Sequence, residues 1–248
     1  MSRAGGGKPA LHRLFLVLIA LAAASWPTEI LAGTTALEGI AGWEGDSHGQ
    51  GYGFAGIGWL VPAGPRLVVP LRAFGSYLYY DFESSGAVTR VRSPGVTMMA
   101  GIRFPGTRGN LTLMAGGETR QEHRTAEAQT ISGIVLQADG DRAFNPRWRG
   151  YLFVNYGGAS RYLYSRTAMR RQVSNLDWKR PTAFFLGLEL IGQGNDETRA
   201  AQGGAFAEWN LVRQSASLAL HGGYKESWSP GENYRRGGYL GLTLYRRF

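Results

Sequence analysis

The chain has 248 residues, a formal net charge of +9 and no cysteine. The length suits one all-β domain, and the lack of cysteine excludes a disulfide framework. With only four histidines, a structural zinc site is not expected either. Most of the positive charge is arginine scattered along the chain rather than clustered among aromatic residues, so we expect no nucleic-acid partner.

Residues 1–32 have the pattern of a secretory signal peptide. A basic stretch that ends at Arg13 precedes an apolar run at 14–24. The run is shorter than the ~20 residues that a membrane-spanning helix needs, and we expect cleavage after Ala32. An uncleaved N-terminal anchor is the alternative. The remainder, 33–248, is predicted to be a single domain that could cross a membrane only as a closed β-barrel.

Twelve strands are predicted in this domain from alternation of apolar and polar residues. In the fourth, for example, Val96 and Met98 share one face, whereas Thr97 and Met99 share the other. The strands are expected near 35–43, 51–60, 66–81, 95–104, 110–121, 129–138, 147–156, 160–170, 182–191, 201–211, 215–224 and 237–248. Ten or fourteen strands also fit the pattern.

The connections between these strands alternate in length. Compact Pro/Gly turns at 60–65 and 104–109 alternate with longer polar stretches, expected for example at 83–94 and 121–128. Outer-membrane barrels have short periplasmic turns and longer outer loops. The sequence therefore predicts an all-β, antiparallel transmembrane β-barrel with both termini in the periplasm. A soluble β-sandwich or lipocalin-like barrel, with its apolar residues inside, is the alternative.

The last expected strand, 237–248, alternates apolar and polar residues up to a final aromatic residue. Closing strands of outer-membrane barrels commonly end in this way. We therefore expect Tyr245 and Phe248 to act as an assembly signal for the barrel-assembly machinery. The expected location is the cell outer membrane, where lipid surrounds the barrel.

If the apolar faces meet lipid, the polar faces project into the lumen. The residues expected there are Arg72, Arg103, Glu118, Arg120, Arg149, Asn155, Glu189, Glu208, His221 and Arg247. Opposite charges in a narrow barrel can form ion pairs that close it, and we expect the arginines to meet Glu118, Glu189 and Glu208. The alternative is a selectivity lining for an anionic or sugar-like solute.

Two expected outer loops carry candidate sugar contacts. Asn195, Asp196 and Glu197 form an acidic loop without the ligand spacing of an EF-hand. Trp228 and Tyr234 could stack on sugar rings, or they could belong to the aromatic belt at the membrane interface. Solvated loop tips are the simpler interpretation of both.

The sequence predicts no catalytic residues, metal ligands or other cofactor site. Lipid A deacylase barrels pair a histidine with a serine two residues further along the strand. Neither His48, His123 nor His221 is followed by a serine at that spacing. The Asp and His cluster that omptin-type proteases carry at the rim cannot be assembled from this sequence either, so we do not expect an enzyme.

Four stretches together carry a resemblance to a known family: GYGFAGIGW at 51–59, GLELIGQGNDE at 187–197, GGAF at 203–206 and GYLGLTLYRRF at 238–248. They resemble the BcsS family of bacterial cellulose-biosynthesis proteins, which are predicted outer-membrane barrels. It implies an accessory role in producing or exporting cellulose, an exopolysaccharide, with that polysaccharide or cellulose-synthesis components as partners. A small general porin or structural barrel is the alternative function, and a lipid A-modifying or proteolytic barrel is the second.

Overall fold

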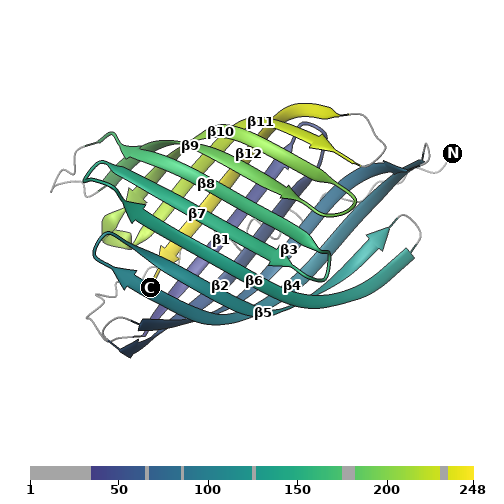
Figure 1. The fold of residues 1–248 in the computed structure, drawn as a ribbon. Coiled ribbons are helices and arrows are strands. Elements are labelled where there is room, and N and C mark those ends of the chain that lie inside the picture. Colours follow the sequence, from purple (N-terminus) through teal and green to yellow (C-terminus); the bar gives the residue numbers. More distant parts are fainter. Residues whose placement is uncertain (1–34, 65–66, 85–86, 125–126, 175–181, 230–233) are drawn as a thin grey trace.

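The computed structural model describes residues 35–64, 67–84, 87–124, 127–174, 182–229 and 234–248. Over these ranges, twelve antiparallel strands form a closed barrel (Figure 1). Each strand pairs with its neighbours in sequence, and the last pairs with the first from Glu38↔Arg247 to Asp46↔Tyr239. The predicted all-β antiparallel barrel and its strand number are confirmed; the periplasmic location of the termini stays a prediction. The signal peptide expected at 1–32 lies outside the described residues.

The strands have the following bounds: β1 (Ala36–Asp46), β2 (Gly51–Gly64), β3 (Leu67–Ser84), β4 (Ala87–Gly106), β5 (Gly109–Arg124), β6 (Glu127–Ala143), β7 (Trp148–Gly157), β8 (Tyr162–Gln172), β9 (Thr182–Gly194), β10 (Arg199–Leu211), β11 (Ala216–Trp228) and β12 (Arg235–Arg247). A short 3-10 helix, η1 (Val212–Gln214), joins β10 to β11. No helix in these described ranges is long and apolar enough to cross a membrane.

The barrel has two distinct ends. We call the end at which β1 begins and β12 finishes the turn end; in Figure 1 it lies on the left, where the C-terminus is marked. The connections from β2 to β3, β4 to β5 and β6 to β7 lie there. The opposite end, which carries the β3–β4 and β5–β6 connections, is called the loop end.

The prediction of a loop at 83–94 is wrong, because most of this segment belongs to strands. β3 continues to Ser84 and β4 begins at Ala87. The loop expected at 121–128 shrinks in the same way. Antiparallel pairing satisfies the backbone groups whether or not the side chains alternate in polarity. The alternation of apolar and polar residues therefore marks only the part of each strand that faces lipid, and the strands continue beyond it.

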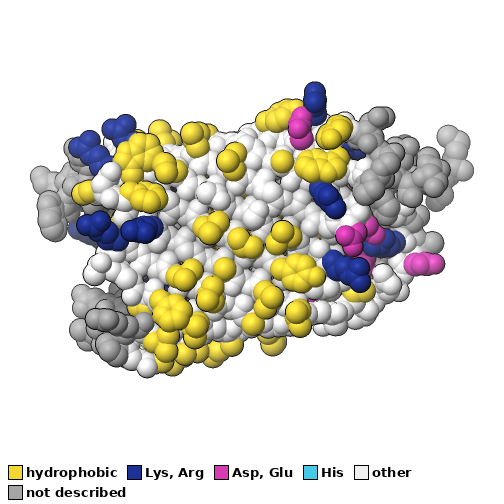
Figure 2. Space-filling view, in the orientation of Figure 1, with side chains coloured by type: hydrophobic (Ala, Val, Ile, Leu, Met, Phe, Trp, Pro, Cys, Tyr) yellow, Lys and Arg dark blue, Asp and Glu magenta, His cyan; other side chains and the backbone are white. Residues whose placement is uncertain are grey.

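The outer wall is apolar and the inner face is polar. Leu188 and Leu190 are 70% and 69% exposed, whereas Glu189 between them is 3% exposed. Figure 2 shows hydrophobic side chains across the middle of the barrel wall and charged ones toward its ends. This is the pattern of a barrel surrounded by lipid, and it contradicts the soluble alternative, whose apolar residues would point inward.

Candidate functional site

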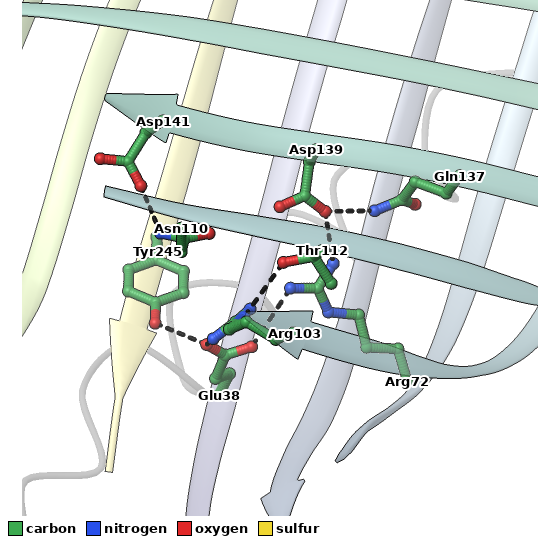
Figure 3. Close-up of polar contacts among 9 residues, drawn as sticks. All are labelled: Glu38, Arg72, Arg103, Asn110, Thr112, Gln137, Asp139, Asp141 and Tyr245. Carbon is green, nitrogen blue, oxygen red and sulfur yellow. Dashed lines mark hydrogen bonds and ion pairs between the residues drawn. The ribbon is translucent and has the colours of Figure 1, made fainter. Parts of the chain in front are cut away.

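The lumen near the turn end is built around one carboxylate, that of Glu38 on β1, which is 4% exposed (Figure 3). Its oxygens lie 3.4 Å from Nη2 of Arg72 and 3.3 Å from Nη1 of Arg103. The hydroxyl of Tyr245 donates a third hydrogen bond, of 2.8 Å. These partners come from β3, β4 and β12, so a single carboxylate links four strands through the interior.

The same layer extends across the barrel to β6. The second terminal nitrogen of Arg72 lies 3.4 Å from Asp139 Oδ1, which also accepts a hydrogen bond of 2.9 Å from Gln137. Arg103 Nε donates to the fully buried Thr112 Oγ1 at 3.1 Å. Because Arg72 joins β1 to β6, its guanidinium crosses the lumen instead of lying along the wall (Figure 3).

Two further ion pairs lie near the turn end. Asp141 accepts a hydrogen bond from Asn110 and lies 3.1 Å from Arg149 Nη2. Arg170 on β8 pairs with Glu208 on β10. Arg149 and Glu208 thus lie on the inner side of the wall, but their partners are Asp141 and Arg170.

A second buried cluster surrounds Glu189 in the middle of the barrel. Its Oε1 accepts a hydrogen bond of 2.7 Å from Tyr239 and lies 3.1 Å from His221 Nδ1; its Oε2 lies 2.5 Å from Arg166 Nη2. A histidine paired with a carboxylate is part of many hydrolytic sites. Here, however, a Cβ atom at Gly241 would lie 2.4 Å from His221 Nε2, so the imidazole packs over the glycine, in the space that a larger residue on β12 would fill.

Glu118 and Arg120, both on β5, form a third cluster. Their side chains are 3.6 Å apart, and Arg120 also donates to Ser93 Oγ at 3.1 Å and Ser76 Oγ at 3.2 Å. The backbone N–H of Ala159, in the β7–β8 connection, donates to Glu118 at 3.1 Å. That connection therefore folds toward the lumen and contacts its wall.

Asn155 lies on β7, opposite Gln137 of β6 and Tyr164 of β8 in the ladder. It is therefore on the same face as Arg149, six residues earlier on the strand. Phe153 on this face packs against Tyr164, with ring centroids 5.8 Å apart. Aromatic side chains thus fill part of the interior that the charged residues do not occupy.

The loop end is bridged by Glu197, which lies in the β9–β10 connection. Its carboxylate accepts hydrogen bonds from Arg124 Nη1 at 2.7 Å and from the Tyr80 hydroxyl at 2.9 Å. β3 and β5 lie across the barrel from β9 and β10 in the strand order. Glu197 therefore spans the loop-end mouth, and protein groups already occupy both of its oxygens.

The other outer-loop candidates are placed differently. Asn195 stabilises its own turn, since its Oδ1 accepts hydrogen bonds from the backbone of Glu197 and Thr198. Asp196 forms an exposed pair with Arg161, 3.6 Å apart. The rings of Trp228 and Tyr234 have centroids 6.1 Å apart at 41°, and Tyr234 is 67% exposed.

Tyr245 and Phe248 belong to the seam where β12 meets β1. The Tyr245 side chain points inward to Glu38. The Phe248 N–H donates to the Leu37 carbonyl at 2.7 Å, and its ring lies 4.8 Å from the Arg246 guanidinium carbon. Both residues thus help to close the barrel; their role as an assembly signal remains a prediction.

The sequence interpretation missed the acidic residues of β1 and β6. Glu38 pairs with Arg72 and Arg103, and Asp46 lies 2.7 Å from Lys225. On β6, Asp139 pairs with Arg72 and Asp141 pairs with Arg149. The alternation of the first and sixth strands is weak, so these carboxylates were not assigned to a face. A signal was available, because Glu38, Glu44 and Asp46 share one parity on β1.

The two crossings of the lumen predict low conductance. We expect the folded protein in a planar lipid bilayer to show no large, stable openings. The variant Glu197→Ala should remain closed as well, because the Glu38 layer at the turn end is untouched. Large, stable openings in the unmodified protein would contradict this expectation.

The architecture defines the class of this protein: it has the fold of outer-membrane β-barrels. The translocator domain of the autotransporter NalP from Neisseria meningitidis has a TM-score of 0.50 at 11% identity, covering 95% of this chain and 94% of that one. The β-domain of the Bordetella autotransporter BrkA has a TM-score of 0.47 at 15% identity, covering 87% and 99%. The cellulose biosynthesis protein BcsS family matches residues 33–248, and the chain belongs to that family. Among curated proteins, none matches the chain.

Proposed function

We propose that the protein is an accessory barrel of bacterial cellulose biosynthesis or export, located in the outer membrane. The observation that carries the proposal is the family match over residues 33–248. The exposed apolar wall supports a location in lipid. We further propose that the turn end, and hence both ends of the barrel domain, faces the periplasm, so that the long β3–β4 and β5–β6 hairpins extend on the outer side.

The closed lumen favours an accessory role over a constitutively open glucan pore. A glucan chain that crossed the barrel would have to displace Arg72 from Glu38 and Asp139 at the turn end. It would also have to displace Glu197 from Arg124 and Tyr80 at the loop end. The pair of Arg72 and Glu38 is buried, and breaking it is costly, whereas Arg124 and Glu197 are 33% and 30% exposed and their pair adds less. Transport through the resting barrel is therefore disfavoured mainly by the turn-end layer. Contact with cellulose or with cellulose-synthesis components would then occur at the outside of the barrel.

The polysaccharide contacts that we propose lie at the loop end. Asp196, Trp228 and Tyr234 take no part in the contacts that span the loop-end mouth, whereas both carboxylate oxygens of Glu197 are occupied there. A pair of aromatic rings beside polar groups suits a sugar face and its hydroxyls. We further propose that the protein is not an enzyme, which is supported by the packing of His221 between Glu189 and Gly241.

A deletion strain of a cellulose-producing bacterium tests the proposal. We expect dye binding by cellulose to fall on deletion and to return when the intact gene is supplied. In the complemented strain, the protein should be recovered with the outer membrane and should migrate on gels in a heat-modifiable way. Unchanged cellulose in the deletion strain would overturn the cellulose role, even if the protein is an outer-membrane barrel, and would favour a porin or structural barrel.

A further inference from the structure

The turn-end mouth contains a pocket of about 390 Å³. Its charged and amide-bearing lining residues are Arg103, Arg108, Asn110, Asp141, Arg149 and Arg247. The Glu38 layer compensates Arg103, which lies 3.3 Å from Glu38, so the other three guanidinium groups and the Asp141 carboxylate leave a net charge of two positive units. Lys and Arg side chains also gather at the turn end of the outer surface shown in Figure 2, so this face adds positive charge at the same end of the barrel.

The pocket is closed on its inner side by the Glu38 layer. Thr112 and Asp139 lie one step deeper on the same face than the lining residues Asn110 and Asp141. Both belong to the hydrogen-bonded layer that Arg72 carries across the barrel (Figure 3). A molecule that enters from the turn end therefore meets a floor of paired charges, and the pocket is suited to binding rather than passage.

Donors outnumber acceptors in this pocket. The Asp141 carboxylate already takes Asn110 and Arg149. Among the residues that the structure describes, no carboxylate lies within 4 Å of the Arg247 guanidinium. The buried Nε–H groups of Arg149 and Arg247 likewise have no hydrogen-bond acceptor. Like charges gathered in a recess repel one another unless an anion is held between them.

We propose that the turn-end pocket binds an oxyanion of the phosphate class. The guanidinium group offers a planar pair of donors that matches two oxygens of phosphate. A doubly charged anion neutralises the two net positive charges, which a single carboxylate would not. The same chemistry is found in free phosphate and in a phosphoryl lipid headgroup, and the pocket is open to either from the turn end. This inference does not depend on the cellulose role.

Isothermal titration of inorganic phosphate into the folded mature chain in maltoside micelles tests the proposal. We expect saturable binding by the unmodified protein and a loss of affinity of about tenfold or more in Arg247→Gln, because one charge-assisted donor is removed. The matched control is Arg171→Gln. Arg171 lies near the same end but points outward, 5.9 Å from the Trp148 ring centroid, and this variant should bind as the unmodified protein does.

Each outcome of the titration bears on the pocket. Competition by micelles doped with phosphatidylethanolamine would identify the headgroup as the source, and its absence would identify free phosphate; both support the proposal. An equal loss in Arg171→Gln would indicate unspecific attraction to a basic surface and would overturn it. So would the absence of saturable phosphate binding by a protein shown to be folded by heat-modifiable migration, or binding of an acidic peptide without binding of phosphate.

Discussion

Replacing Glu38 with alanine is expected to lower the free energy of unfolding by about 3–5 kcal/mol, which is the usual cost of removing one partner from a buried ion pair. The variant leaves the guanidiniums of Arg72 and Arg103 facing each other without their shared carboxylate. It also removes the acceptor of the Tyr245 hydroxyl at the β1–β12 seam. Urea unfolding in lipid vesicles, followed by tryptophan fluorescence, measures the loss.

Two variants provide the comparison for Glu38→Ala. Asp196→Ala breaks an ion pair whose side chains are 78% and 76% exposed, and it should cost about 0–1 kcal/mol. The double variant Glu38→Ala/Arg103→Ala should cost less than the sum of the two single changes, because it removes one of the charges left unpaired. Equal losses in Glu38→Ala and Asp196→Ala would show that the Glu38 layer does not hold the barrel together.

Replacing Leu188 with arginine is expected to destabilise the protein in a bilayer by about 2–4 kcal/mol, the cost of a cation on the lipid face near the midplane. Leu188 lies at the centre of β9 and is 70% exposed. The next residue in the chain, Glu189, lies on the opposite face of the strand and points into the barrel. The measurement is reversible unfolding from lipid vesicles, compared with the unmodified protein.

The control for Leu188→Arg is the same substitution at Leu211, on the outer face at the turn end of β10. Leu211 is 38% exposed and lies at the edge of the wall. There the arginine can reach the interface, and we expect a cost of about 0–1 kcal/mol. Equal effects at both positions would contradict a lipid-facing band centred on the middle of the strands.

Only some of the contacts in the lumen could be predicted from the sequence, because chain order gives the neighbouring strands but not the contacts across the barrel. Neighbouring strands follow chain order, so a sequence indicates that Glu118 and Arg120 share a face of one strand, and they do form a pair. The contacts between Arg72 and Asp139, or between Glu197 and Tyr80, join strands far apart in that order. They depend on barrel width and on how strands tilt and shear around the circle, which local patterns do not encode.

The sequence alone determined the class of fold and the face on which most strand residues lie, because a strand has a side-chain period of two and lipid selects one face for apolar residues. It did not determine the strand ends beyond the lipid band, where both faces are polar and pairing of backbone groups decides the length. Only the tertiary structure assigned Glu38 to Arg72 and Arg103, and Glu189 to Arg166. Glu38 meets its partners because the curvature of the closed barrel turns the inner faces of β1, β3 and β4 toward one another, and Arg166 reaches Glu189 across the pair formed by β8 and β9.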